Sequence, residues 1–449
     1  MKLKIILYSV LTLSAGVSLS QNDNRQNDSV LHMNLNTALT IANDHNPTIK
    51  IANLEIERTN YSKKETLGAL LPNISISGQY VNNLKKPVMF LPQGMELIGG
   101  GKDYMEIGSA NSYQLSASAA LPLVNFSLWE SINAKQYDMD LIIEQCRASK
   151  IDMAKQVKDA YYAVLLAKAS LDVLEQSINN AKETLESTKA AYEQGVVSEY
   201  DYIRAQVQVN NLNPTYISAK NSLELATLQL KMILSLPANQ KIEMTETLES
   251  FATNISLLDM MQKDANLDNN TEIKQIDLNI KSLQSKLKTI NTQHLPSLSA
   301  FASYTVQTQA DDFKFNDYNW VKSAQVGLQL SIPVFSGLTV VNQSKQAKIA
   351  IKELELQKQY VIDGMDLNIR SAIDNMKAAN EQLIANKDAI AQAARGYDIA
   401  KVRYQTGSGT ILELNDSELS LTQAKLNYQQ SLYNFLTAQS NLDKVMGKE

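Results

Sequence analysis

Apolar and polar residues alternate with a period of two in four stretches of the chain. In the clearest one, at 320–333, Val326 and Leu328 alternate with Gln325 and Gln329. The same alternation occurs in three further stretches: 72–82, 111–122 and 296–308. A period of two predicts strands. A sheet with one face on a soluble core would give this pattern, but strands of about ten residues, tilted by roughly 45°, match a membrane's hydrocarbon layer and favour a membrane sheet.

Between the strands the apolar period becomes helical. Val157, Tyr161 and Val164 recur at spacings of four and three, which is typical of a coiled-coil seam. No proline interrupts 123–194, so a single helix there would be about 100 Å long at a rise of about 1.5 Å per residue. We expect two antiparallel helix pairs, with the ranges 123–194 and 198–235, then 338–406 and 410–446.

The chain contains an internal repeat. Residues 46–80 align without a gap to 270–304, and 115–128 match 327–340. Each half is therefore expected to contain a strand, a hairpin loop, a strand, a long helix, a tight turn and a return helix. The expected boundaries are 21–236 for the first repeat, 237–266 for a segment without a counterpart, and 267–449 for the second repeat.

The two helix reversals share one sequence phrase. "YEQGVVSEYDYI" ends the first long helix and "YQTGSGTILELND" ends the second. Each has a glycine suited to end a helix, and three residues later a serine or threonine suited to start the next one. The acid that follows makes a capping box of Thr410 and Glu413 and an acidic near-equivalent of Ser198 and Asp201. The other turn residues expected in these two tips are Gly195, Val196, Gly407, Ser408 and Gly409.

The N-terminus has the features of a secretory signal peptide. Lysines precede an apolar run at 5–17, and Ser18 and Ser20 occupy the positions before an expected cleavage point. The run is too short to span a membrane as a helix. We expect residues 1–20 to be removed, so that the mature chain begins near Gln21.

Composition and isolated residues exclude several classes of function. The formal charge of -5 is spread along the chain, so nothing points to nucleic acid and we expect no nucleic-acid partner. Cys146 has no disulfide partner and lies far from the cleavage point, so we expect a small buried side chain there rather than a lipid anchor. His32, His45 and His294 lack metal-ligand spacing. With no catalytic constellation or phosphate-binding loop, we expect no enzyme, no metal and no cofactor.

Four strands are too few to close a barrel. An open edge in lipid would leave backbone groups unsatisfied at several kcal/mol each, so the chain is expected to oligomerise. A dimer would supply eight strands, a trimer twelve and a tetramer sixteen. Because about eight strands enclose an interior filled by side chains, a conduit needs at least the trimer.

Together these features resemble the TolC-like outer-membrane efflux proteins. The strand-to-helix junctions "LPLVNFSLW" and "LSIPVFSGL" are similar to the family's Pro-aliphatic-Phe-x-Gly signature, through Pro122 and through Pro333, Phe335 and Gly337. The resemblance covers essentially the whole mature chain. It implies an α+β membrane protein in which a trimeric twelve-stranded barrel in the outer membrane continues as an α-helical coiled-coil barrel in the periplasm. The implied partners are outer-membrane lipid, a periplasmic adaptor and an inner-membrane pump, and the cargo would be drugs, toxic compounds or secreted proteins.

The resemblance also implies roles for residues of the tips. Glu413 and Asp416 correspond to the acids of the family's entrance constriction, where carboxylates around a three-fold axis would attract cations. For Glu413 the capping and pore roles are both open, whereas Asp416 lies past the cap positions and favours the pore role over an ordinary solvated helix face. Tyr404 and Asp201 correspond to a latch of closed forms. Gly409 falls where the best-known member carries a locking arginine, so the closed state is held less firmly or by other contacts.

A soluble periplasmic adaptor or scaffold built from coiled-coil hairpins is the alternative from another class. It accounts for the helices and the signal peptide. It does not account for four alternating strands placed symmetrically in two repeats, and we therefore favour the outer-membrane exit duct.

Overall fold

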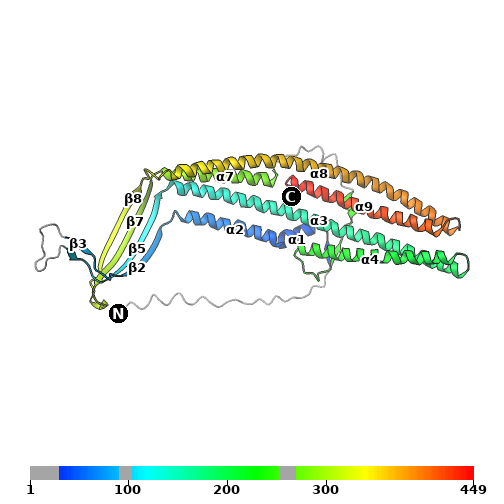
Figure 1. Ribbon diagram of the computed structural model, residues 1–449, viewed down its shortest axis with the longest axis horizontal. Helices are drawn as coiled ribbons and strands as arrows, with labels where there is room; N and C mark the ends of the chain where they lie inside the picture. The colour runs from blue at the N-terminus through cyan, green and yellow to red at the C-terminus, as the bar shows by residue number, and fades with distance from the viewer. Residues whose placement is uncertain (1–29, 91–103, 253–268, 449) are drawn as a thin grey trace.

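The chain is elongated, with a sheet at one end and long helices extending from it (Figure 1). The computed structural model describes residues 30–90, 104–252 and 269–448. The expected signal peptide at 1–20 lies outside the described residues, as does the part of the expected inter-repeat segment that begins at residue 253. No described helix contains an apolar stretch long enough to cross a membrane.

Four antiparallel strands form one sheet in the order β2-β5-β7-β8. Their bounds lie within two residues of the expected ranges: β2 Asn73–Asn82, β5 Asn111–Val124, β7 Ser297–Ala310 and β8 Val321–Ser331. Tyr304 of β7 stands opposite Ala117 of β5 and Ala324 of β8. Within the described part of the chain, the outer edges of β2 and β8 pair with no further strand.

A second, smaller hairpin extends the connection between β2 and β5 (Figure 1). It consists of β3, Val88–Phe90, paired antiparallel with β4, Tyr104–Glu106. Phe90 is 74% exposed at the end of β3. This hairpin lies within a range where sequence analysis assigned no strands, because three-residue strands are too short to establish a period.

The long helices form two pairs that run side by side away from the sheet. The first pair is α3, Phe126–Glu193, with α4, Glu199–Ile233, and the second is α8, Thr339–Gln405, with α9, Ile411–Val445. Helix α9 also packs against α3, which joins the pairs. Their bounds differ from the expected ranges by three residues or fewer.

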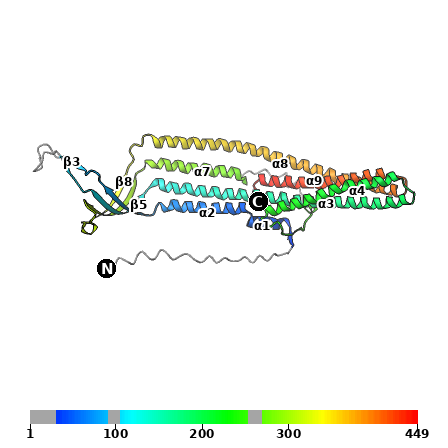
Figure 2. The ribbon, with the colours of Figure 1, turned by 60° about the horizontal axis from the view of Figure 1, so that its bottom comes forward.

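Four α-helices of the described chain were not assigned from the sequence, and the shortest of them is α5, Leu248–Ala252. The other three are longer. They are α1 Leu35–His45, α2 Pro47–Gly68 and α7 Thr271–Asn291. Helices α2 and α7 lie along α3, and α7 also packs on α8 (Figure 2). Within the single chain α2 buries only Ile49 among its described residues, so its apolar pattern is weak. The local start signals are nevertheless clear, since the side chains of Asn46 and Asn270 cap α2 and α7.

The two strand-to-helix junctions turn the chain by different means. Pro122 lies in β5 where the register with β7 shifts, as expected of a residue that has no N–H to donate. At the second junction Gly337 and Leu338 are both left-handed, with φ of 62° and 61°. A glycine adopts this conformation without strain, which accounts for the glycine of the signature. Phe335 is 80% exposed and Pro333 is exposed.

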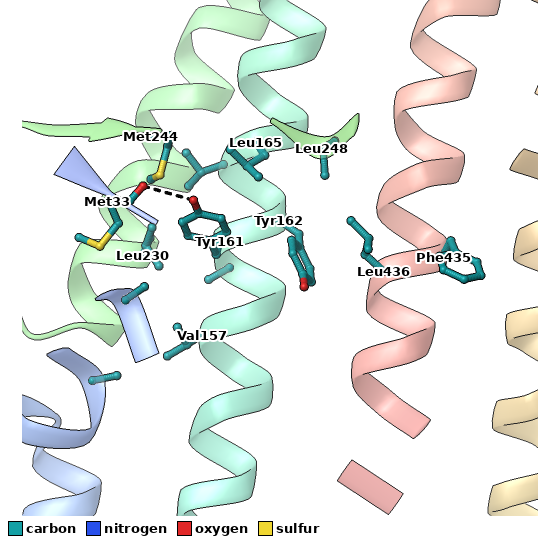
Figure 3. Packing of buried hydrophobic residues seen from close by; sticks show 14 of the residues in the cluster. Met33, Val157, Tyr161, Tyr162, Leu165, Leu230, Met244, Leu248, Phe435 and Leu436 are labelled. Atoms are coloured by element: carbon teal, nitrogen blue, oxygen red, sulfur yellow. Dashed lines mark hydrogen bonds between the residues drawn. The ribbon is translucent and has the colours of Figure 1, made fainter. Parts of the chain in front are cut away.

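The main core lies midway along the helices, where Tyr161 of α3 is fully buried (Figure 3). Its hydroxyl donates to the Glu246 carboxylate at 2.8 Å and also lies 3.2 Å from the Met33 carbonyl oxygen. Glu246 accepts a second bond from the Leu35 backbone N–H at 2.9 Å. Here β1, Leu31–Met33, pairs in parallel with β6, Ile242–Met244. One buried tyrosine therefore joins the N-terminal segment, the long helix and the segment between the halves.

Replacing this hydroxyl should destabilise the fold. We expect Tyr161→Phe to lower the free energy of unfolding by about 1–3 kcal/mol, because the partly buried Glu246 carboxylate loses one of its two donors. Tyr162→Phe is the matched control, since Tyr162 is 7% exposed and its hydroxyl has no hydrogen bond among the described residues. Urea unfolding of the detergent-purified protein, followed by circular dichroism, measures the difference; equal midpoints for the two variants would contradict this role.

Candidate functional site at the helical tips

Both helix reversals lie at the end of the molecule far from the sheet (Figures 1 and 2). We call the turn between α3 and α4 the first tip and the turn between α8 and α9 the second tip. In the first, Gly195 is left-handed with φ of 74°, and its N–H and that of Val196 bond back to the carbonyls of Tyr192 and Ala191. Gly407 has φ of 73° in the second. These are Schellman-type helix ends, which satisfy the last carbonyls of each long helix.

The caps that start α4 and α9 differ from expectation. Ser198 and Asp201 form the complete capping box, because each side chain accepts a hydrogen bond from the other residue's backbone N–H, at 3.2 and 3.3 Å. Thr410 accepts from the Glu413 N–H at 3.2 Å, but Glu413 does not return the bond within the described structure. The expected box at Thr410 and Glu413 is therefore wrong, and the near-equivalent is the complete one.

Arg403, in the last turn of α8, explains the missing bond. Its Nη1 lies 3.3 Å from Oε2 of Glu413, and its Nη2 donates to the Ser408 carbonyl at 3.2 Å. A Cβ added at Gly409 would lie 3.0 Å from the Cβ of Arg403, so the glycine makes room for this side chain. Arg403 was not predicted from the sequence, although a basic residue in the last turn of a helix is a recognised stabilising pattern.

The two acids of the second tip have different surroundings. The Glu413 side chain is 46% exposed and paired with Arg403. Asp416 is exposed, and its carboxylate has no hydrogen-bond or ion-pair partner among the described residues. An exposed ion pair contributes little to stability, but it partly neutralises Glu413 and leaves the full charge of Asp416 facing solvent.

Tyr404 and Asp201 line the same pocket between the two tips without pairing with each other. The Tyr404 hydroxyl is 2.8 Å from the Thr188 hydroxyl of α3, and the Asp201 carboxylate is bonded to Ser198. A latch between Tyr404 and Asp201 would need both side chains to exchange partners, or to meet between subunits, and it stays a prediction.

Other residues singled out in the sequence lie away from the tips. Cys146 is 5% exposed on α3, with its Sγ 3.5 Å from Oδ1 of Asn53. His32 pairs with Glu243 at 3.4 Å, and both side chains are more than half exposed. Among the described residues, no group of three or more histidine, cysteine, aspartate or glutamate side chains is arranged to hold a metal ion.

Comparison with known proteins places the chain in a family. The family model described as outer membrane efflux protein matches residues 38–235 and 264–448. The outer membrane protein TolC of Escherichia coli is 24% identical over 390 residues, which cover 82% of this chain and 76% of that protein. The alkaline protease secretion protein AprF of Pseudomonas aeruginosa is 21% identical over 346 residues, covering 76% of this chain and 70% of that protein.

A solved structure agrees with the fold. The CmeC outer membrane channel of Campylobacter jejuni superposes with a TM-score of 0.68 at 18% identity, and the match covers 92% of this chain and 85% of that one. Members of the matched family are outer-membrane efflux and secretion channels, not enzymes. The chain therefore belongs to the outer membrane efflux protein family.

Proposed function

We propose that the chain is one subunit of a trimeric exit duct, in which three four-stranded sheets close a twelve-stranded barrel in the outer membrane. The helices of the three subunits would form a coiled-coil tunnel in the periplasm, gated at the tips. An adaptor and an inner-membrane pump would engage the tip end. The observation that carries this proposal is the two-faced, open-edged sheet at the opposite end.

One face of the sheet is suited to lipid. The register sets Ile74, Ala119, Ala302 and Val326 in one row across the four strands. Within the single chain Ile74 is 74% exposed and Val326 is 87% exposed. A row of exposed apolar side chains is unfavourable in water and favourable against hydrocarbon.

The other face is suited to water. Ser75 and Ser118 share a hydrogen bond of 2.9 Å across β2 and β5, and Ser116 and Thr305 share one of 3.2 Å across β5 and β7. These pairs lie in two neighbouring polar rows, which alternate with the apolar rows along each strand. Phe301 is one of the apolar residues on this face, and its ring packs over Gly327, where a Cβ would lie 2.8 Å away. This division is the apolar-out and polar-in pattern of an aqueous barrel.

The unpaired edges support assembly by three copies. Edge backbone groups cannot remain unpaired in lipid, so β2 of one subunit would pair with β8 of the next. Twelve strands leave a water-filled interior, whereas about eight would be filled by side chains. A soluble adaptor has no use for such a sheet, and that alternative is not favoured.

The tip end suits docking and selection. Val196 is 74% exposed at the first tip and Leu412 is 44% exposed at the second, which offers apolar contacts to an adaptor. Around a three-fold axis, Asp416 would supply unpaired carboxylates to the entrance. The relatives include a protease secretion protein and efflux pump proteins, and we propose that the pump and the adaptor set the cargo of this chain.

The lipid-facing row provides the first test. We expect Val326→Arg to abolish the heat-labile trimer in outer-membrane fractions, because a lipid-facing arginine near the bilayer midplane costs about 2–4 kcal/mol per subunit. Its neighbour supplies the control, since Gln325→Arg places the same side chain on the polar face. Semi-native electrophoresis of membrane fractions compares them. A trimer that survives both changes would contradict the assignment of faces.

The entrance charge provides a second test. Because Arg403 partly neutralises Glu413, Asp416→Asn should reduce cation selectivity more than Glu413→Gln does, and Arg403→Gln should increase it. Reversal potentials across planar bilayers in a KCl gradient report these changes. If the three variants had the same cation selectivity, the assignment of these residues to the entrance constriction would be contradicted.

The latch provides a third test. If Tyr404 pairs with Asp201 in the closed trimer, Tyr404→Phe and Asp201→Asn should each increase the resting conductance in planar bilayers. Thr188→Val removes the bond that Tyr404 makes within the chain and is the control. A conductance increase in Thr188→Val, without one in Asp201→Asn, would assign the closing contact to Thr188 instead.

A further inference from the structure

A carboxylate interrupts the apolar seam of α9. Ile411, Leu414 and Leu421 are buried on one face of this helix, and Glu418 lies on the same face at the intervening position. Glu418 is only 2% exposed. Spacings of three and four mark a seam position that normally takes an apolar residue, so the acid destabilises the packing unless something compensates.

The surroundings of Glu418 come from both helix pairs. Asn180 of α3 and Lys401 of α8 are the polar groups that act on its carboxyl. One turn along, the Thr422 hydroxyl of α9 donates to the Ser177 hydroxyl of α3 at 3.1 Å, and both residues are buried. Oε1 of Glu418 has no hydrogen-bond partner among the described residues. The acid therefore lies in the contact that joins α9 to α3 and α8, with part of its hydrogen-bonding capacity unused.

Burial raises the pKa of the Glu418 carboxyl to about 7, although the Asn180 side chain and the charge of Lys401 act to lower it. Tyr397 of α8 faces the same cluster, and burial together with the charge of Glu418 raises its pKa to about 12, so it stays neutral. The remaining charges that act on the cluster are Glu183 of α3 and Asp398 of α8.

We propose that Glu418 is a proton-sensitive joint between the two helix pairs, which holds the tips packed when protonated and loosens them when ionised. The inference rests on the proposed function, because it assigns a regulator to the same entrance. A protonated carboxyl is neutral and fits the seam. An ionised one lacks a full set of partners there and is stabilised by water, which it reaches only if α9 separates from α3 and α8.

The direction of the response follows from linkage. In the packed arrangement the proton is held up to about pH 7, whereas in a loosened, hydrated arrangement the carboxyl would have its ordinary pKa of 4.5. The packed arrangement is thus most stable below pH 4.5. The equilibrium towards the loosened one rises by up to about tenfold per pH unit between these two values and levels off above pH 7.

Single-channel recordings in planar bilayers between pH 5 and 8 test the joint through the open probability of the channel. We expect the open probability of the wild-type channel in planar bilayers to rise with pH up to about 7. Glu418→Gln should stay at the low-pH level throughout, because the amide mimics the protonated acid. Glu186→Gln, an exposed acid near the first tip, is the matched control and should keep the wild-type profile. Lys401→Met should move the midpoint to higher pH, because it removes a charge that lowers the pKa of Glu418.

A cross-link gives a second readout that does not depend on how well the glutamine variant folds. Ser177→Cys with Thr422→Cys, in a Cys146→Ala background, should form a disulfide across the joint and abolish the pH response until a reductant is added. If the Glu418→Gln variant or the oxidised cross-linked protein kept the wild-type pH profile, the proton-sensitive joint would be contradicted. The proposed channel function would not be affected by that result. A wild-type protein that forms no channel at any pH would overturn the proposed function, and the joint with it.

Discussion

Backbone hydrogen bonding at the edges of the sheet is the constraint on which the rest of the molecule depends. The outer edges of β2 and β8 are unpaired within the described chain, and hydrocarbon offers no water to satisfy them. The apolar face of this sheet, with Val326 87% exposed, is not covered by any other described part of the chain and is unfavourable in water. The helices also expose apolar residues along their length, such as Leu356 of α8 and Met232 of α4, and the proposed assembly with neighbouring copies would cover them.

The helices carry this arrangement to the far end of the molecule. Their middle is tied together by Tyr161 and Glu246, where the core is densest, and their ends are closed by local turns that need little tertiary support. Between these regions the seam of α9 contains polar residues such as Glu418 and Thr422. Apolar burial is therefore greater at the middle of the helices than towards the tips, where polar groups enter the contacts between helices.

Much of the architecture could be predicted from the sequence, because the hydrophobic period of an element and a helix-ending glycine are both read from residues close together in the chain. The strands and long helices follow from repeats of two and about 3.6 residues, and Gly195 and Gly407 end helices through their own backbone conformation. Helix α2 was missed because it buries little within one chain. The complete capping box was predicted at Thr410 and Glu413 but lies at Ser198 and Asp201. The reason is that the Glu413 carboxylate pairs with Arg403, and this contact joins two different helices.

The sequence by itself determined the order of the elements, the positions of the tips and the division of each strand into two faces, because each depends on residues close together in the chain. Only the tertiary structure decided which of the acids are paired, exposed or buried. Asp416 and Glu418 are two residues apart on one helix, yet the first faces solvent and the second faces α3 and α8. The chemistry of a carboxylate depends on the helices packed around it, and spacing along one helix does not reveal them.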